Sequence, residues 1–360
     1  MRRPMRVGRA ECAGVLLSLA PMKAAILPEF GQPLRIEDVP TPVPAADEVL
    51  IQVEACGVCH SDLHIAHGDL AGFRAATKER VIPGHEVIGK VVAKGADVAH
   101  LAIGDRVGVA WLHWACGVCE QCREGLENLC RKGIVTGMMV DGGFAEFMRA
   151  KASHALKVPP SLDPAEAAPL FCAGVTVYRA LRNAGVGPGQ RVAVFGVGGL
   201  GHVAVQIAKA FGAEVHGFDV SADKLALARE LGAASTFDVT DADTVKAVRK
   251  LGGMHVAVVT SAAKAAYDMA LRCLRPAGTL AVVGLPAEPL SFQALALVGS
   301  EVRIVSAAVG TRDDLRATLE LAVAGKLRCR IEEVPLAAVN EVFERMQRGA
   351  INGRMVLRCC

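Results

Sequence analysis

The chain has 360 residues, of which 52% are hydrophobic and 21% are charged, and it contains 37 glycines. This composition excludes a disordered or fibrous protein and is typical of an α/β enzyme, and the length predicts two domains. Basic residues exceed acidic ones by only 3, and no basic block alternates with aromatic residues, so nucleic acid is not an expected partner. No apolar run reaches the roughly 18 residues of a membrane helix, so no membrane partner is expected either.

The first 21 residues have a basic start and a short apolar stretch at 13–20, which are features of a secretory signal. The stretch is short, however, and no convincing small-residue cleavage site follows it. Met22 and the residues after it resemble the natural start of a chain. We therefore expect residues 1–21 to be a disordered extension or to lie outside the native protein, and we expect the protein to act in the cytoplasm.

The chain changes character near Pro169. Before it, short β-like runs such as 48–53 and 87–93 are punctuated by glycine and proline, which predicts an irregular, β-rich unit. After it, apolar runs of strand length alternate with stretches of helical period, which is typical of βαβ units around a parallel sheet. The expected strands are 191–195, 214–218, 255–260, 279–283 and 302–305, and the expected helices are 200–211, 221–231 with Ser221 as its cap, 263–274, 313–324 and 336–347.

Four cysteines, Cys116, Cys119, Cys122 and Cys130, lie within 15 residues. Such short, repeated spacings indicate a structural zinc site, because four soft thiolates fill the tetrahedral coordination of the ion. A filled site stiffens a lobe and does not react. Free thiols and an iron–sulfur cluster are the alternatives. Free thiols at this density are open to oxidation, and a cluster has no second redox centre in the sequence with which to exchange electrons.

A glycine-rich segment, GVGGLG at 196–201, follows one expected strand and opens the next expected helix. In this position glycines let the backbone approach a pyrophosphate, which amides at the helix N-terminus then bind. The alternative is a tight turn without a ligand. The residues expected to bind the dinucleotide are Gly196, Gly198, Gly199, Leu200 and Gly201.

Asp219 ends the next expected strand, 23 residues after Gly196. An acidic residue at about this separation binds the hydroxyls of the adenosine ribose. Its charge repels a 2′-phosphate, and no arginine follows immediately to reverse the effect. The sequence therefore predicts NAD in preference to NADP.

Cys59, His85 and Cys172 are far apart in the sequence, and spacing alone does not join them. Their surroundings do, because several segments occur in the order typical of the medium-chain zinc-dependent alcohol dehydrogenases. The chain resembles this family from Met22 to its end, and the segments 309–315 and 349–354 resemble its bacterial, propanol- or ethanol-preferring branch. The matching segments are GVCHSDLH at 57–64, PGHE at 83–86, the four cysteines, PLFCAGVTVY at 169–178 and GVGGLGH at 196–202.

The resemblance implies an α/β fold in two domains. One is a GroES-like, β-rich catalytic domain over residues 22–170 and 311–360. The other is a doubly wound, parallel-sheet Rossmann domain that binds NAD over residues 171–310. The resemblance also implies two zinc ions per subunit, a small-molecule alcohol or aldehyde as partner, and a homotetramer or homodimer.

At the catalytic zinc, the resemblance implies three ligands, Cys59, His85 and Cys172, and one open coordination position. Zinc lowers the pKa of a bound alcohol hydroxyl, and an alkoxide is a better hydride donor than an alcohol. By the same resemblance Glu86 can approach the metal. Asp62 is expected to orient His85 by accepting its other ring proton.

The resemblance further implies residues for proton removal and for coenzyme binding. Ser61 is expected to contact the substrate oxygen and His64 to pass the proton to solvent, with His67 as the weaker candidate. A plain surface histidine is the alternative for His64. The further coenzyme contacts implied are His60 and Arg354 at the pyrophosphate, Thr176 near the nicotinamide and Lys224 near the ribose.

Trp111 and Leu70 are expected to line the substrate pocket. In ethanol-type relatives a second tryptophan can occupy the position of Leu70, and leucine leaves volume that an indole would fill. This favours small primary alcohols and also longer or aromatic ones.

Two rival functions stay open from the sequence. An NADP-linked cinnamyl-alcohol-type aldehyde reductase shares the zinc signatures and the glycine turn, but Asp219 argues against NADP. A catalytically inactive nucleotide-binding sensor is the rival from another class. Such a protein usually loses its catalytic ligands, whereas Cys59, His85 and Cys172 are all present.

Overall fold

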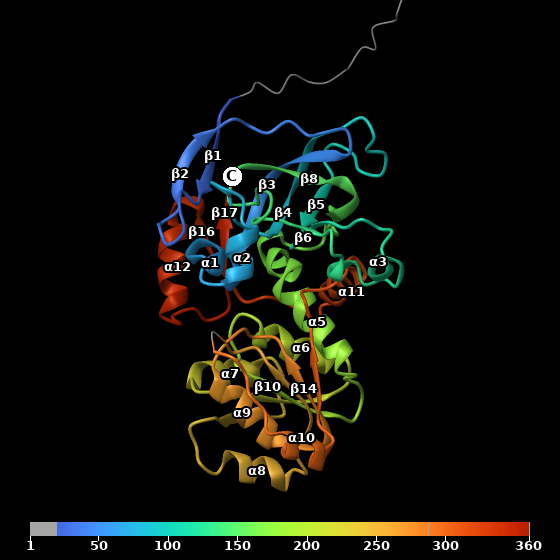
Figure 1. Cartoon of the computed structure of the whole chain (residues 1–360), viewed down its shortest axis with the longest axis vertical. Helices are drawn as coiled ribbons and strands as arrows, with labels where there is room; N and C mark the ends of the chain where they lie inside the picture. Colours follow the sequence, from blue (N-terminus) through green and yellow to red (C-terminus); the bar gives the residue numbers. More distant parts are fainter. Residues whose placement is uncertain (1–19, 287, 360) are drawn as a thin grey trace, which may run out of the picture.

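The structure, a computed structural model, describes residues 20–286 and 288–359. The chain forms two lobes, and its last segments return to the lobe that its first segments began (Figure 1). The expectation for the N-terminal extension falls almost entirely on residues 1–19, which lie outside the described residues. Within the described part of the chain, no helix is both long and apolar enough to cross a membrane.

The first lobe is built on a seven-stranded sheet with the order β16-β17-β3-β4-β5-β9, in which β8 also pairs with β3. All neighbours are antiparallel except β16 and β17, which are parallel. Since β17 pairs with β3, the end of the chain completes a sheet begun near its start. The strands are β3 (Glu48–Val58), β4 (Glu86–Lys94), β5 (Arg106–Val109), β8 (Phe147–Lys151), β9 (Leu156–Lys157), β16 (Ile331–Pro335) and β17 (Arg354–Arg358).

Smaller elements surround this sheet. Two strand pairs, β1 (Met22–Ile26) with β2 (Arg35–Val39) and β6 (Leu112–Trp114) with β7 (Ile134–Val135), lie beside it. The helices and helical turns are α1 (His60–His67), α2 (Ala71–Ala76), α3 (Glu120–Arg123), η1 (Glu127–Leu129), η2 (Ala152–His154), α4 (Pro164–Ala167), η3 (Ala168–Phe171), η4 (Leu336–Ala338) and α12 (Val339–Gln347).

The second lobe is built on a six-stranded, fully parallel sheet with the order β12-β11-β10-β13-β14-β15. Its strands are β10 (Arg191–Phe195), β11 (Glu214–Asp219), β12 (Ser235–Asp238), β13 (Met254–Val259), β14 (Leu274–Val282) and β15 (Arg303–Ser306). The helices are α5 (Ala173–Asn183), α6 (Gly201–Ala210), α7 (Ala222–Glu230), α8 (Thr244–Lys250), α9 (Lys264–Cys273) and α10 (Ala294–Ser300). A further helix, α11 (Arg312–Val323), follows the last strand of this sheet and packs against α5.

The central strand β10 is apolar almost throughout because both of its faces are covered. Val192 and Val194 pack in the hydrophobic cluster that includes α5 and α6. Ala193 and Phe195 point to the other face and pack with Tyr267 of α9. Helices on both faces of a parallel sheet define a doubly wound arrangement. The expected fold class, a β-rich unit with a doubly wound parallel sheet, is confirmed.

Three local predictions are wrong. The strand expected at 279–283 begins already at Leu274, directly after α9, and it bends at Ala277, whose φ is 56°. Ser221 does occupy the N-cap position of α7, but its side chain makes no capping hydrogen bond there. The carboxylate of Asp219 accepts the Ser221 N–H instead, at 3.0 Å. The last expected helix begins at Val339, because residues 336–338 form the tighter turn η4.

A buried ion pair joins α5 to α11. Asp314 lies in the first turn of α11, where its carboxylate forms a capping box with Thr311. The same carboxylate is 2.7 Å from a guanidinium nitrogen of Arg179 on α5, and both side chains are almost fully buried. Removing one member of such a pair leaves the other charge buried without compensation.

Replacing Asp314 with alanine is therefore expected to lower the free energy of unfolding by about 3 kcal/mol. The neighbouring Asp313→Ala is the matched control, because Asp313 is exposed and pairs with Arg316 on the surface. Urea denaturation of both variants measures the difference. Equal midpoints for the two variants would show that the buried pair contributes nothing to stability.

Candidate active site

The first site segment is the turn from β3 into α1. Cys59 is the N-cap residue of α1, and its sulfur accepts the N–H of Ser61 at 3.5 Å. Asp62 completes a capping box by accepting the backbone N–H of Cys59 at 2.8 Å. A helix N-terminus stabilises negative charge and favours the thiolate form of a cysteine. The local sequence thus favours the thiolate form of Cys59.

The second site segment lies just before β4. His85 is fully buried, and its Nδ1 lies 3.0 Å from Asp62 Oδ1, which also accepts the N–H of Gly84 at 3.1 Å. The ionised carboxylate can only accept, so Nδ1 carries a ring hydrogen, and in the neutral ring Nε2 has a free lone pair. Nε2 is buried and has no hydrogen-bond partner among the described residues.

The third site segment joins η3 to α5. Cys172 lies between them, and its sulfur is 3.9 Å from that of Cys59. The ligand atoms of Cys59, His85, Glu86 and Cys172 all lie within 4.8 Å of one another, and all four residues are buried. The sulfur separation is too long for a disulfide, whose S–S bond is about 2 Å. It matches the separation of about 3.8 Å between thiolates that share a tetrahedral zinc ion.

This group passes a chemical test for zinc. The buried Nε2 of His85 has no hydrogen-bond partner among the described residues, and two cysteine sulfurs lie beside it. Sulfur and imidazole nitrogen are the donors that zinc prefers. An unpaired polar atom in the core costs free energy, and a bound metal ion would remove that cost.

Glu86 is directed to Arg354 of β17. Their side chains form a buried ion pair, and the other carboxylate oxygen, Oε2, has no partner in the described chain. Burial raises the pKa of Glu86 to about 7, although Arg354 acts in the opposite direction. Gly57 permits this arrangement, because a Cβ there would lie 2.0 Å from Glu86 Oε2. This direct pair was not predicted, because its two partners are 268 residues apart in the chain.

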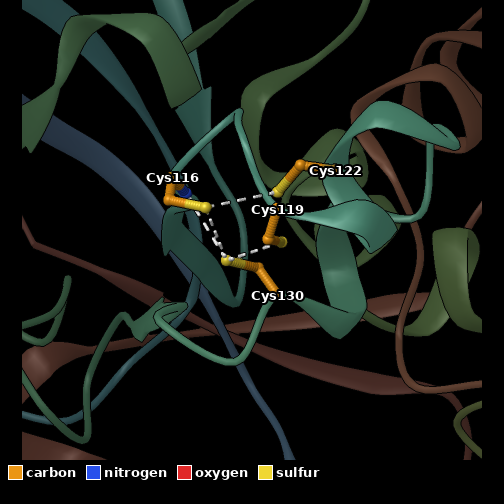
Figure 2. A group of neighbouring side chains, drawn as sticks. All are labelled: Cys116, Cys119, Cys122 and Cys130. Atoms are coloured by element: carbon orange, nitrogen blue, oxygen red, sulfur yellow. Dashed lines mark hydrogen bonds between the residues drawn. The ribbon is translucent and has the colours of Figure 1, made fainter.

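The four clustered cysteines meet in the segment around α3 and η1 of the first lobe (Figure 2). Their ligand atoms lie within 4.8 Å of one another, with individual sulfur separations of 3.6 to 3.9 Å. These separations again exclude disulfides and fit a tetrahedral tetrathiolate site. Hydrogen bonds from the backbone of Val118 and Cys119 lower the pKa of Cys116 to about 6, which favours the thiolate. This four-cysteine segment contacts α11 through Glu127, whose carboxylate is 3.1 Å from Arg312.

The glycine turn lies between β10 and α6. Gly196 has a φ of +86°, and Gly201 has no room for a side chain, because a Cβ there would lie 1.8 Å from the Gly196 carbonyl oxygen. Thr260 at the end of β13 donates its hydroxyl to that carbonyl at 2.6 Å. This role of Thr260 was not predicted; the signal that could have indicated it is a threonine at the carboxyl end of the strand next to the turn.

Asp219 lies at the end of β11 and is nearly buried. Its Oδ2 accepts the N–H of Val197 in the glycine turn at 2.7 Å. The carboxylate is therefore fixed beside the turn, and each of its oxygens still has a lone pair for another donor.

The remaining expected residues are spread around these groups. Trp111 stacks its ring edge-on to His85, with ring centroids 4.8 Å apart, and also contacts Phe73 of α2 at 5.6 Å. Phe73 was not among the predicted site residues. Leu70 is the N-cap residue of the same helix α2.

The residues expected to move the proton and to bind the coenzyme lie on α1, α5 and α7 and at the start of β17. On α1, the ring of His64 is 3.0 Å from the carboxylate of Asp69, while His67 contacts Gln347 instead. His60 is exposed at the start of α1, Thr176 is buried on α5, and Lys224 is half-buried on α7. Arg354 lies against the turn, where a Cβ on Gly199 would be 3.1 Å from its side chain.

Comparisons with known proteins identify the family. Residues 45–160 match the model described as alcohol dehydrogenase GroES-like domain, and residues 199–324 match the model described as zinc-binding dehydrogenase. An alcohol dehydrogenase of Geobacillus stearothermophilus is 45% identical over 338 residues, which cover 94% of this chain and 99% of that protein.

Solved structures agree. The alcohol dehydrogenase of the hyperthermophilic archaeon Aeropyrum pernix is 37% identical with a TM-score of 0.85, covering 93% of this chain and 99% of that one. A cinnamyl alcohol dehydrogenase from Sorghum bicolor is 32% identical with a TM-score of 0.83, covering 94% and 97%. The cinnamyl alternative is thus not better supported.

The chain belongs to the medium-chain zinc-dependent alcohol dehydrogenases. It is an oxidoreductase of small alcohols and aldehydes that works with zinc and a nicotinamide coenzyme. The family and the function class expected from the sequence are confirmed.

Replacing Asp62 with asparagine is expected to lower zinc affinity or activity by about 10- to 100-fold, because the imidazole of His85 loses the carboxylate that orients it. Zinc retained against a competing chelator and kcat/KM measure the effect. Asp141→Asn is the matched control, since Asp141 also accepts a backbone N–H, from Ile82, but lies outside the site. Unchanged zinc retention and activity in Asp62→Asn would contradict this role.

Proposed function

We propose that the chain transfers hydride between primary alcohols and NAD, and that it reduces the corresponding aldehydes in reverse. The observation that carries this proposal is the buried group of Cys59, His85 and Cys172, in which Nε2 of His85 has no protein partner among the described residues. These three residues would hold the catalytic zinc, with Glu86 as a nearby reserve ligand. Zinc there would act as a Lewis acid that makes the alcohol hydroxyl more acidic.

Residues of α1 would remove the alcohol proton. Ser61 lies beside Cys59, with its hydroxyl oxygen 3.7 Å from that sulfur, which is a suitable place to contact a substrate oxygen. His64 follows three residues later on the same helix face. Its side chain is 24% exposed and its ring is held by Asp69, so it can exchange a proton with solvent. We assign proton exit to His64, not to His67.

A second zinc would stabilise the four-cysteine segment. Cys116, Cys119, Cys122 and Cys130 leave no coordination position for a substrate, which supports a structural role. Two zinc ions per chain are therefore proposed.

The pocket would be bounded by Trp111 and Phe73, whose rings touch, and by Leu70 at the start of α2. A leucine at this position occupies less volume than an indole. The pocket should therefore accept small primary alcohols and also longer or aromatic ones.

The purified protein is expected to contain two zinc ions per chain and to form NADH from primary alcohols faster than from secondary alcohols or polyols. Metal analysis and initial rates over an alcohol panel measure both. Removing the accessible zinc with a chelator should abolish activity, and added zinc should restore it, because the Lewis acid is then lost and regained. One zinc per chain together with no activity would favour the inactive sensor, and a preference for polyols would refute the substrate class.

For the coenzyme, we propose NAD over NADP. Asp219 supports this choice, because its carboxylate is fixed beside the glycine turn by the N–H groups of Val197 and Ser221. Ribose hydroxyls can donate to its remaining lone pairs, whereas a 2′-phosphate meets a like charge. The other coenzyme contacts proposed are His60, Thr176, Lys224, Arg354 and the turn residues Gly196, Gly198, Gly199, Leu200 and Gly201.

Asp219→Asn is expected to lower kcat/KM for NADH by about 10- to 100-fold, because a charge-assisted hydrogen bond to the ribose is weakened. The kcat/KM for NADPH should change less, so the preference for NADH over NADPH should become smaller. Asp238→Asn is the control: Asp238 ends the neighbouring strand β12, and its carboxylate accepts the N–H of Thr240. A wild-type protein that strongly prefers NADPH would favour the cinnamyl-type alternative.

We further propose a catalytic domain of residues 22–170 and 311–360 and a coenzyme domain of residues 171–310. The sheet pairing of β17 with β3 supports this division. Two clusters of reduced thiols support a reducing compartment such as the cytoplasm.

A homo-oligomer, dimer or tetramer, is also proposed. β15 is the edge strand of the parallel sheet, and α10, which contacts the neighbouring strand β14, leaves Leu295 84% and Val298 75% exposed. An open strand edge next to exposed apolar side chains is a surface that another chain can cover.

Light scattering is expected to give the mass of a dimer or tetramer. Leu295→Glu combined with Val298→Glu should shift the mass toward the monomer, because burying two charges opposes association. Ile103→Glu is the control, since Ile103 is also 64% exposed but lies in the other lobe. A monomeric wild-type protein would contradict the proposal.

A further inference from the structure

His202 is fully buried in the first turn of α6, directly after the glycine turn. Its Nδ1 lies 2.9 Å from the carbonyl oxygen of Gly198. Its other ring nitrogen, Nε2, accepts the backbone N–H of Arg330 at 3.2 Å. One side chain therefore bridges the turn in one lobe and a segment that leads into β16 of the other lobe.

These two bonds define the state of the ring. A carbonyl oxygen only accepts, so Nδ1 must carry a hydrogen, and a backbone N–H only donates, so Nε2 must be bare. The neutral ring with hydrogen on Nδ1 is the form that makes both bonds. Burial lowers the pKa of His202 to about 4, which agrees with a neutral ring.

The bond to Gly198 also orients the turn. The Gly198 carbonyl accepts both the backbone N–H and the ring N–H of His202. Because a trans peptide holds its N–H opposite to its carbonyl, the N–H of Gly199 points out of the helix N-terminus. A pyrophosphate would lie there.

The bond to Arg330 continues to the candidate zinc site. The carbonyl of Arg330 accepts the N–H of Arg354 at 2.8 Å, and the side chain of Arg354 pairs with Glu86. Gly353 permits this close approach, because a Cβ there would lie 2.4 Å from the Arg330 carbonyl oxygen. A continuous path of hydrogen bonds thus runs from the turn to a residue beside His85.

A second bridge lies one helical turn further along α6. The side-chain amide of Gln206 donates to the carbonyl of Arg328 at 2.9 Å and accepts the N–H of Arg328 at 3.0 Å. It also donates to the backbone carbonyl of His202 at 3.0 Å. The same face of α6 is therefore attached to residues 328–330 by two side chains.

We propose that His202 is a positioning residue for hydride transfer, which holds the glycine turn of one lobe in register with Arg354 and Glu86 of the other. This inference rests on the proposed function, since it concerns the distance between a bound nicotinamide and the substrate. Hydride transfer is sensitive to misplacement of about 1 Å. A coenzyme held through its pyrophosphate carries any shift of the turn to its reactive ring.

Two substitutions separate the two bonds. In His202→Asn, the shorter amide can still donate to Gly198 but cannot reach Arg330. In His202→Gln, the longer side chain can accept from Arg330 but no longer places a donor at Gly198. We expect His202→Asn to lower kcat by about 10- to 100-fold with little change in NADH affinity. The turn keeps its bond to residue 202, but its position relative to Arg330 and the other lobe is no longer held. We expect His202→Gln to weaken NADH binding by about 10-fold.

The measurements are the NADH dissociation constant by fluorescence, kcat and KM with NAD and 1-propanol, and the deuterium isotope effect on kcat with deuterated 1-propanol. Zinc content and thermal stability are recorded for every variant. His216→Asn is the matched control, because His216 is also buried in the coenzyme lobe but bonds to Ser235, away from the turn. It should lose stability without losing kcat or NADH affinity.

Lower kcat with a larger isotope effect in His202→Asn, at unchanged zinc content, supports the proposal. Variants that lose only stability, as His216→Asn does, overturn it. If the His202 variants do not fold, Gln206→Ala decides: a severalfold loss of kcat supports the positioning role, and an unchanged kcat overturns it. If the wild-type protein oxidises no alcohol, the proposed function fails, while the NADH affinities still test His202.

Discussion

The carboxylate of Asp62 accepts three hydrogen bonds, from the N–H groups of Cys59 and Gly84 and from Nδ1 of His85. The first fixes the start of α1, and the other two fix the loop before β4. With Nδ1 of His85 bonded to Asp62, the ligand atom of this imidazole lies within 4.8 Å of the sulfurs of Cys59 and Cys172. The local arrangement of ligands therefore depends on a residue that is not itself among the proposed ligands.

The two lobes converge on this centre through the last segments of the chain. β17 lies beside β3 in the sheet of the first lobe, and Arg354 at its start contacts both Glu86 and the glycine turn. A nicotinamide coenzyme bound at the turn would thus be coupled to the residues around His85. The last segments of the chain therefore connect the glycine turn to the lobe in which the chain began.

Local chemistry made part of the site predictable. The four clustered cysteines and the glycine turn are contiguous, so their spacing alone carried the interpretation. Cys59, His85 and Cys172 were joined through a family resemblance, because spacing says nothing about residues brought together by topology. Thr260, Phe73 and the Glu86–Arg354 pair were not found, since each contact depends on strands and helices that are distant in sequence. The bend of β14 at Ala277 was missed for a related reason: local propensity does not encode the register with β13.

The central claim is that Cys59, His85 and Cys172 together hold a zinc ion. Anomalous diffraction from crystals of the purified protein, recorded on both sides of the zinc absorption edge, tests it most directly. Two peaks per chain are expected, one among Cys116, Cys119, Cys122 and Cys130 and one among Cys59, His85 and Cys172, with Nε2 of His85 as a ligand. No peak among Cys59, His85 and Cys172 in crystals of active protein would contradict the claim.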